Sequence, residues 1–129
     1  DDGRVISMSS LAAVYGIPEE AVYSASKSAV RAITEALNIE FRAQGIWVSD
    51  VMVAYVDSPM VRDAKHQARS VEVLGVNVMP EQVADTVFLA AAEKRVHWFV
   101  TEADTEFAKQ IDRLEWEHRP DFILSIAGF

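Results

Sequence analysis

Apolar runs rich in β-branched residues alternate along this chain with longer segments of helical periodicity, and this alternation constrains the fold more than any other feature. Residues 46–53 form the clearest run, and their apolar character is typical of a parallel strand that is buried on both faces. The expected elements, in chain order, are strand 4–9, helix 20–44, strand 46–53, short helix 59–69, helix 80–93, strand 96–100, helix 104–117 and a tail. Strands that alternate with helices predict an α/β fold whose parallel sheet is built with right-handed crossovers.

The first expected helix has recognisable ends and one apolar face. Pro18 and Glu20 suit a helix start, because proline fits the first turn and an acidic side chain favours the positive end of the helix dipole. Gly45 is the expected stop at the other end. Between these ends, four apolar side chains recur at helical spacing and predict a stripe that faces the core: Val30, Ile33, Leu37 and Phe41.

The composition is that of a globular protein and argues against several classes of function. The 129 residues are 50% hydrophobic and 25% charged, which is unlike a disordered chain. A net charge of −8 without a basic run argues against binding to nucleic acid or to an anionic membrane, and no apolar run has the length of a membrane-spanning helix. The absence of cysteine excludes a disulfide scaffold and suits a cytoplasmic location.

The histidines give no sign of a metal site. His66, His97 and His118 lie far apart in the sequence and lack the paired spacing of typical metal ligands. We therefore expect no bound metal.

Tyr23 and Lys27 are the first candidate catalytic pair. Residues four apart in a helix lie on one face with Cβ atoms about 5–6 Å apart, so a phenol and an ammonium at this spacing can address the same ligand. A free tyrosine ionises at about pH 10, and a neighbouring positive charge favours the phenolate. This pair is therefore suited to exchanging a proton with a substrate.

Ser10, which follows the expected strand 4–9, is the third candidate. Its hydroxyl can both donate and accept a hydrogen bond, which suits the positioning of a substrate carbonyl. The alternative interpretation is structural: a Tyr–Lys pair on the surface of an amphipathic helix and a serine that caps the end of a strand.

The strand that ends in Ser9 and Ser10, the loop after it and the segment Tyr23-Ser-Ala-Ser-Lys27 together resemble the catalytic segment of the short-chain dehydrogenase/reductase family. The resemblance implies a partial Rossmann-like, doubly wound α/β fold, its C-terminal half, and hydride transfer between NAD or NADP and a small-molecule alcohol or carbonyl substrate. It implies that Ser10 positions the substrate oxygen and that Tyr23 is the general acid/base beside the cofactor. Lys27 is implied to bind the nicotinamide ribose and to favour ionisation of the tyrosine.

A second matching region follows the next expected strand. The family usually has Pro-Gly here and, a few residues later, a threonine that meets the nicotinamide carboxamide. Val53 and Ala54 stand in place of Pro-Gly, and Ser58 stands at the threonine position with a hydroxyl retained. The resemblance assigns cofactor contacts to Val56 and Ser58, and the loss of glycine predicts a tighter or differently shaped nicotinamide end. The alternative for Ser58 is a polar turn in which Pro59 starts a helix.

The glycine-rich turn that holds the cofactor pyrophosphate in this family is not found in the chain. Its five glycines form neither Gly-x-x-x-Gly-x-Gly nor Gly-x-Gly-x-x-Gly. Residues 1–129 are therefore expected to be the C-terminal catalytic half of a single domain, a fragment that is inactive alone and lacks the N-terminal dinucleotide-binding half. The missing neighbour strand is expected to leave Val5 and Ile6 on an open edge of the sheet.

Three interpretations of function stay open. The first is an NAD(P)-dependent dehydrogenase in the complete protein, and the second is a non-catalytic binding or scaffold protein, which the change at Val53 and Ala54 and the missing turn favour. The third is an obligate complement to a separate N-terminal chain. The resemblance also implies a homodimer or tetramer, because helix 20–44 is the family's usual dimer surface. The apolar stretch 116–129 is expected to pack on the subunit or to bridge to a neighbour.

Residues 59–79 correspond to the family's variable segment over the active site. This segment mixes apolar side chains with Arg62, Lys65, His66 and Arg69. It fits a hydrophobic substrate or a substrate with an acidic group, and an amphipathic lid that packs on its own domain gives the same pattern.

Overall fold

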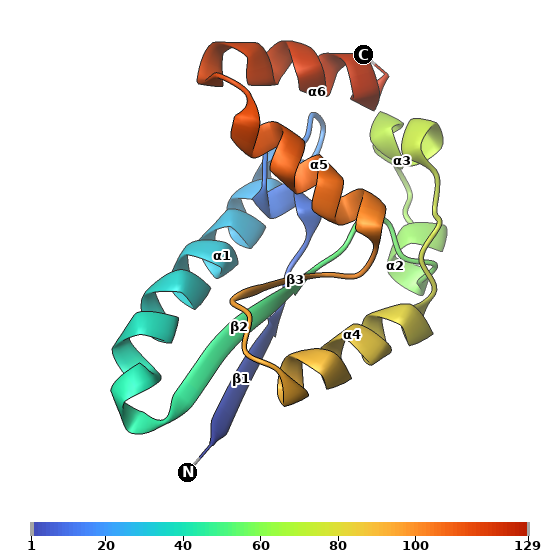
Figure 1. The fold of residues 1–129 in the computed structure, drawn as a ribbon. Coiled ribbons are helices and arrows are strands. Elements are labelled where there is room, and N and C mark those ends of the chain that lie inside the picture. Colours follow the sequence, from blue (N-terminus) through green and yellow to red (C-terminus); the bar gives the residue numbers. More distant parts are fainter. Residues whose placement is uncertain (1, 129) are drawn as a thin grey trace.

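The computed structural model describes residues 2–128, so Asp1 and Phe129 lie outside the described part of the chain. Its centre is a three-stranded sheet in the order β1-β2-β3, and both strand pairings are parallel (Figure 1). The strands are β1 (Gly3–Met8), β2 (Ile46–Met52) and β3 (His97–Phe99). Helices flank this sheet, and the predicted α/β class with a parallel sheet is confirmed.

Helices of very different lengths connect the strands and cover the sheet. The α-helices are α1 (Ala21–Phe41), α2 (Pro59–Arg62), α3 (Arg69–Leu74), α4 (Pro80–Ala92), α5 (Glu102–Arg113) and α6 (Arg119–Ala127). The short 3-10 helices are η1 (Leu11–Ala13), η2 (Arg42–Gln44) and η3 (Trp116–His118).

α1 and α4 lie on opposite faces of the sheet (Figure 1). Successive side chains of a strand point to opposite faces: Val51 and Trp98 pack with Ala90 of α4 in a buried apolar cluster, whereas Asp50 and His97 face α1. The steps from β1 to β2 and from β2 to β3 run in one direction across the sheet, so helices on opposite faces give crossovers of opposite hand. The expectation of right-handed crossovers is therefore wrong for one of the two. The long connection between β2 and α4 is what allows the chain to reach the other face.

α1 meets the sheet through small polar side chains rather than through the predicted apolar stripe. Ser24, Thr34 and Asn38 are its buried residues, and Asn38 Nδ2 donates to the carbonyl of Val48 at 2.7 Å. Ile33, which the stripe places toward the core, is 56% exposed. The other three residues of the stripe are half-buried: Val30, Leu37 and Phe41. Internal hydrogen bonds make the burial of Ser24 and Asn38 favourable, whereas Thr34 Oγ1 has no hydrogen-bond partner in the described part of the chain. Periodicity of apolar residues does not reveal these contacts.

The predicted helix end at Gly45 is confirmed. Gly45 has a φ of 74°, in the left-handed region that glycine adopts without a Cβ penalty. The predicted short helix 59–69 is wrong, because α2 and α3 are two separate helices. The start of α3 is set by a contact with a distant segment, since the backbone N–H of Arg69 donates to Glu19 Oε2 at 3.0 Å.

The prediction of a tail after the helix 104–117 is also wrong, because α6 (Arg119–Ala127) forms most of this stretch. Ile123 and Ala127 of α6 are four residues apart and pack with Ile111 of α5 in a second buried apolar cluster. Of the two alternatives for this stretch, packing on its own chain is the one that the structure shows for residues 116–128.

The outer edge of β1 has no partner strand within residues 2–128. Val5 is 44% exposed beside this edge, as predicted. Ile6 is half-buried rather than exposed. Its side chain points to the other face of the sheet and packs against the cluster of Val51, Ala90 and Trp98.

A chain of polar side chains links α1 to β2 and β3. His97 Nδ1 lies 2.8 Å from Asp50 Oδ1, and His97 Nε2 lies 3.0 Å from Glu35 Oε1. Asp50 is fully buried, at 0% exposure. The hydrogen bond to Asp50 is the main cause that raises the pKa of His97 above its ordinary value, and burial acts in the opposite direction.

We expect the protein to lose stability as the pH rises through the folded-state pKa of His97. Two carboxylates stabilise the imidazolium only in the folded state, so the native protein binds more protons than the unfolded chain. The contribution is complete below the unfolded pKa of about 6.5 and is lost above the raised folded pKa. Urea unfolding from about pH 6 to pH 9 measures it.

The matched variants are His97→Leu and, as a control, His118→Leu at an exposed histidine. At about pH 6 the first should lower the free energy of unfolding by about 1–3 kcal/mol and flatten its pH dependence. A wild-type profile as flat as that of His97→Leu would contradict the prediction.

Candidate active site

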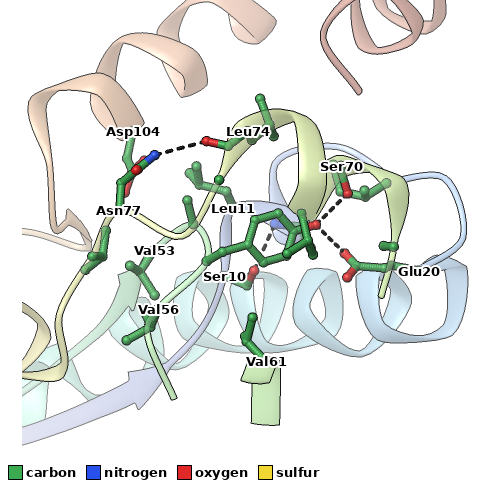
Figure 2. A pocket seen from close by; sticks show the side chains of 18 of the residues that line it. Ser10, Leu11, Glu20, Val53, Val56, Val61, Ser70, Leu74, Asn77 and Asp104 are labelled. Atoms are coloured by element: carbon green, nitrogen blue, oxygen red, sulfur yellow. Dashed lines mark hydrogen bonds between the residues drawn. The ribbon is translucent and has the colours of Figure 1, made fainter. Parts of the chain in front are cut away.

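A cavity of about 690 Å³ opens at the carboxyl ends of β1 and β2 (Figure 2). Residues of the β1–α1 loop, the β2–α4 connection, α5 and α6 line it, and Leu11, Val53 and Leu74 are among its apolar side chains. Polar atoms contribute the smaller part of the cavity wall, the surface that lines this cavity. A concave, largely apolar site with a few convergent polar groups is the usual form of a small-molecule site.

Ser10 lies at this cavity, two residues after the end of β1. Its Oγ accepts a hydrogen bond from the backbone N–H of Ala12 at 3.1 Å and caps η1. The hydroxyl proton takes no part in that bond, so it is available to donate to a ligand. The structural role and the predicted substrate-binding role of Ser10 are therefore compatible.

Tyr23 lies near the start of α1 and lines the same cavity. Lys27 is one turn later, where its Nζ lies 5.5 Å from the centroid of the Tyr23 ring and donates to the carbonyl of Met8 at 3.1 Å. Lys27 is not part of the cavity wall as described for residues 2–128. The structure thus brings Ser10 and Tyr23 to one cavity and holds Lys27 against the tyrosine ring.

Val56 and Ser58, the two predicted cofactor contacts in the β2–α4 connection, also line the cavity. Val56 forms a parallel bridge with Val78, which joins the two ends of that connection. Ser58 is the N-cap residue of α2 and its side chain makes no capping hydrogen bond, while Pro59 begins the helix. The helix start proposed in the alternative interpretation is therefore present, and it leaves the hydroxyl of Ser58 without a capping role.

Val53 and Ala54 form their part of the loop without glycine. Val53 is 7% exposed, and its carbonyl accepts a hydrogen bond from the backbone N–H of Leu11 at 3.0 Å. Over residues 2–128, Glu19 is the only non-glycine residue with a positive φ, so Ala54 is not in the left-handed region. The backbone at this position does not require glycine.

Sequence reasoning missed a polar group of the cavity formed by Tyr55, Glu20 and Ser70. Tyr55 Oη lies 2.6 Å from Ser70 Oγ and donates to Glu20 Oε2 at 3.3 Å (Figure 2). Burial is the main cause that raises the pKa of Tyr55 to about 12, so this phenol is neutral at ordinary pH. Burial also raises the pKa of Glu20.

These contacts hold α3 close to the start of α1. The hydrogen bond from Arg69 to Glu19 adds a second link between the same two segments. The sequence carries one usable signal, since Glu20 is only three residues before Tyr23 and immediately precedes α1. It carries no local signal that pairs Tyr55 with Ser70.

Asp104, in the first turn of α5, is another carboxylate that lines the cavity and that sequence reasoning missed. It is 6% exposed, and its Oδ2 is buried without a hydrogen-bond partner in the described part of the chain. Burial raises the pKa of Asp104, and hydrogen bonds with the Thr101 side chain and the Ala54 backbone oppose that rise.

Of the four basic residues in the segment 59–79, His66 lines the cavity. Arg62 instead forms an ion pair with Asp57, with Nη1 2.6 Å from Oδ1. No lysine or arginine belongs to the cavity wall within residues 2–128. The interpretation in which arginine or lysine of this segment meets an acidic group of the substrate gains no support.

Over the same residues, no group of three or more His, Cys, Asp or Glu side chains is placed to hold a metal ion. No helix there is both long and apolar enough to span a bilayer.

The amino-acid sequence matches a known family over more than half of its length. The family described as short chain dehydrogenase matches residues 1–69, which include Ser10, Tyr23, Lys27 and Ser58. The 3-oxoacyl-(acyl-carrier-protein) reductase of Rickettsia felis is 33% identical over 96 residues, which make up 71% of this chain and 40% of that reductase.

Solved structures show the same fold. A short chain dehydrogenase from Burkholderia cenocepacia, in complex with NADP, superimposes with a TM-score of 0.75 at 20% identity, covering 97% of this chain and 49% of that chain. A short chain dehydrogenase/reductase from Burkholderia phymatum, in complex with NAD, has a TM-score of 0.69 at 22% identity, covering 84% and 46%. The chain spans less than half the length of each of these three relatives.

The contact between Tyr55 and Ser70 is expected to stabilise the fold. Tyr55→Phe leaves the Ser70 hydroxyl, in a residue that is 1% exposed, without its partner and should lower the free energy of unfolding by about 1–2 kcal/mol. A double-mutant cycle with Ser70→Ala, measured by urea unfolding, should give a coupling of at least about 0.5 kcal/mol. Additive effects of the two substitutions would show that the contact does not stabilise the fold.

Proposed function

We propose that this chain, which belongs to the short-chain dehydrogenase family, is the catalytic half of an NAD(P)-dependent oxidoreductase that interconverts an alcohol and a carbonyl compound. The observation that carries the proposal is the convergence of Ser10 and Tyr23 on one largely apolar cavity, with the ammonium of Lys27 against the tyrosine ring. Family membership and the parallel sheet, which is shared with nucleotide-bound relatives, support it.

In the proposed reaction, Ser10 and Tyr23 both address the oxygen of the substrate. Ser10 donates its hydroxyl proton to that oxygen while its Oγ stays fixed by the N–H of Ala12. Tyr23 gives its proton to the oxygen during reduction and takes it back during oxidation. Lys27, held by the carbonyl of Met8, places a positive charge beside the ring, and positive charge favours the phenolate form of a tyrosine.

The residues present fit the nicotinamide end of a cofactor. The hydroxyl of Ser58 has no capping role, and both Ser58 and Val56 line the cavity. Tyr23 and Lys27 would supply a hydroxyl and an ammonium for a ribose. The cofactor, NAD or NADP, would supply the hydride in its reduced form and accept it in its oxidised form. The absence of a left-handed φ at Ala54 supports this fit, because the loop reaches its conformation without the usual glycine.

We propose that residues 1–129 are the C-terminal half of one domain and that an N-terminal half with the glycine-rich turn completes the enzyme. Two observations support this division: the chain spans 40% of the reductase from Rickettsia felis, and β1 has an edge to which no strand is paired within residues 2–128. By itself the chain is expected to be inactive.

We further propose that the complete protein is a homodimer or tetramer that associates through α1. The helix exposes apolar side chains on its outer side, with Val22 86% and Ile39 73% exposed. Exposed apolar residues along one helix commonly mark a protein interface.

The experiment that tests the proposed function is Tyr23→Phe in the complete protein. Loss of the proton donor should reduce turnover of an alcohol or carbonyl substrate by at least about 100-fold, while the affinity for NADH or NADPH changes little. Tyr15→Phe is the matched control, because Tyr15 packs in the cluster around Ile111 and is not part of the cavity wall. Turnover that survives Tyr23→Phe would contradict the assigned role, and a folded wild type without any turnover would instead favour the binding or scaffold interpretation.

A further inference from the structure

The charged side chains of the cavity wall are mostly acidic. Ser10 and Tyr23, the proposed reacting pair, line the cavity. Glu20 and Asp104 place carboxylates at two separate points of the same wall (Figure 2). The wall within residues 2–128 holds no lysine or arginine to neutralise them, and His66 is its one basic side chain.

Glu20 has acceptor capacity that the protein does not use. Its side chain accepts one long hydrogen bond, from Tyr55 Oη at 3.3 Å, and Ser70 can supply the proton of its own 2.6 Å contact with Tyr55. An ionised carboxylate offers about four acceptor positions, so one long hydrogen bond leaves most of them open. Burial raises the pKa of Glu20, which means that the cavity solvates this carboxylate poorly.

Asp104, in α5, also has a carboxylate oxygen that accepts no hydrogen bond from the described part of the chain. This oxygen, Oδ2, is buried, and Asp104 is only 6% exposed and lines the cavity. An unsatisfied buried carboxylate oxygen is costly. Two carboxylates with unused acceptors on one apolar wall are complementary to a ligand that brings its own donors.

Glu20 also lies close to the proposed reacting centre. It immediately precedes α1 and is three residues before Tyr23, and Tyr55, which donates to Glu20 at 3.3 Å, also interacts electrostatically with Tyr23. A donor that reaches Glu20 is therefore located a few bonds from the oxygen that Tyr23 protonates.

We propose that Glu20 is a specificity-determining residue that selects an uncharged alcohol or carbonyl substrate carrying a second hydroxyl group a few bonds from the reacting carbon. This inference rests on the proposed oxidoreductase function and names its substrate class. Glu20 accepts a hydrogen bond from that second hydroxyl, and the two carboxylates of the wall disfavour anionic substrates.

Three ketones that share the cyclohexanone ring and differ in one substituent test the inference with the complete protein. They are cyclohexanone, 4-hydroxycyclohexanone and 4-oxocyclohexanecarboxylate. The wild type should reduce the hydroxyketone with a kcat/KM at least about 10-fold above that of cyclohexanone, as expected for a hydrogen bond to a charged group. The carboxylate ketone should be the poorest of the three. Glu20→Met keeps the length of the side chain and removes its acceptors, so it should abolish the preference for the hydroxyl.

Two further variants separate a direct contact from an effect on folding. Glu72→Met makes the same chemical change on the exposed side of α3, outside the cavity wall, and should leave all three rates unchanged. Tyr55→Phe removes the internal partner of Glu20 but keeps its carboxylate, so the hydroxyl preference should persist. Glu20→Gln is the substitute if Glu20→Met does not fold, and it should raise the relative rate with the carboxylate ketone.

The inference is overturned if the wild type does not distinguish the hydroxyketone from cyclohexanone, or if Glu20→Met retains the preference. It is also overturned if Tyr55→Phe loses the preference as fully as Glu20→Met, because the effect would then depend on the position of α3. If the protein reduces none of the ketones with NADH or NADPH, the proposed function fails for these substrates, and ligand-observed NMR decides the inference. Binding of 1,4-cyclohexanediol over cyclohexanol in the wild type and not in Glu20→Met supports it, and equal or absent binding overturns it.

Discussion

The parallel pairing of β1 with β2 is the interaction on which the rest of the structure depends. Its register runs from Gly3 opposite Ile46 to Met8 opposite Val51, so the carboxyl ends of both strands lie next to each other. Ser10 follows one strand and the loop with Val56 and Ser58 follows the other, and both therefore reach one cavity. Ligands of open α/β sheets bind at this carboxyl edge for the same topological reason.

Much of this arrangement could be predicted from the sequence, because it depends on local patterns. The four-residue spacing of Tyr23 and Lys27 places them on one helix face wherever that helix packs, and the apolar run of β2 identifies a buried strand. The predicted catalytic and cofactor roles of these residues stay predictions. What the structure adds is that Ser10 and Tyr23 line one cavity and that Lys27 contacts the ring from outside its wall.

The rest could not be predicted, because it depends on contacts between distant segments. Tyr55 and Ser70 meet only once the β2–α4 connection folds back over the cavity, and no periodicity relates them. Asn38 is buried because its side chain finds the carbonyl of Val48 on a neighbouring strand, so a rule that expects apolar residues inside points to Ile33 instead. Both cases have one origin, since Asn38 and Ser70 are buried with hydrogen bonds to segments that are distant in the sequence.

We propose that the cavity at the carboxyl ends of β1 and β2 belongs to a nicotinamide-dependent enzyme. Fluorescence titration of NADH and of NADPH against the complete protein tests this most directly, because binding precedes any choice of substrate. We expect saturable binding of at least one of the two nucleotides, and weaker binding when Lys27 is replaced by methionine. A folded, complete protein that binds neither nucleotide would contradict it.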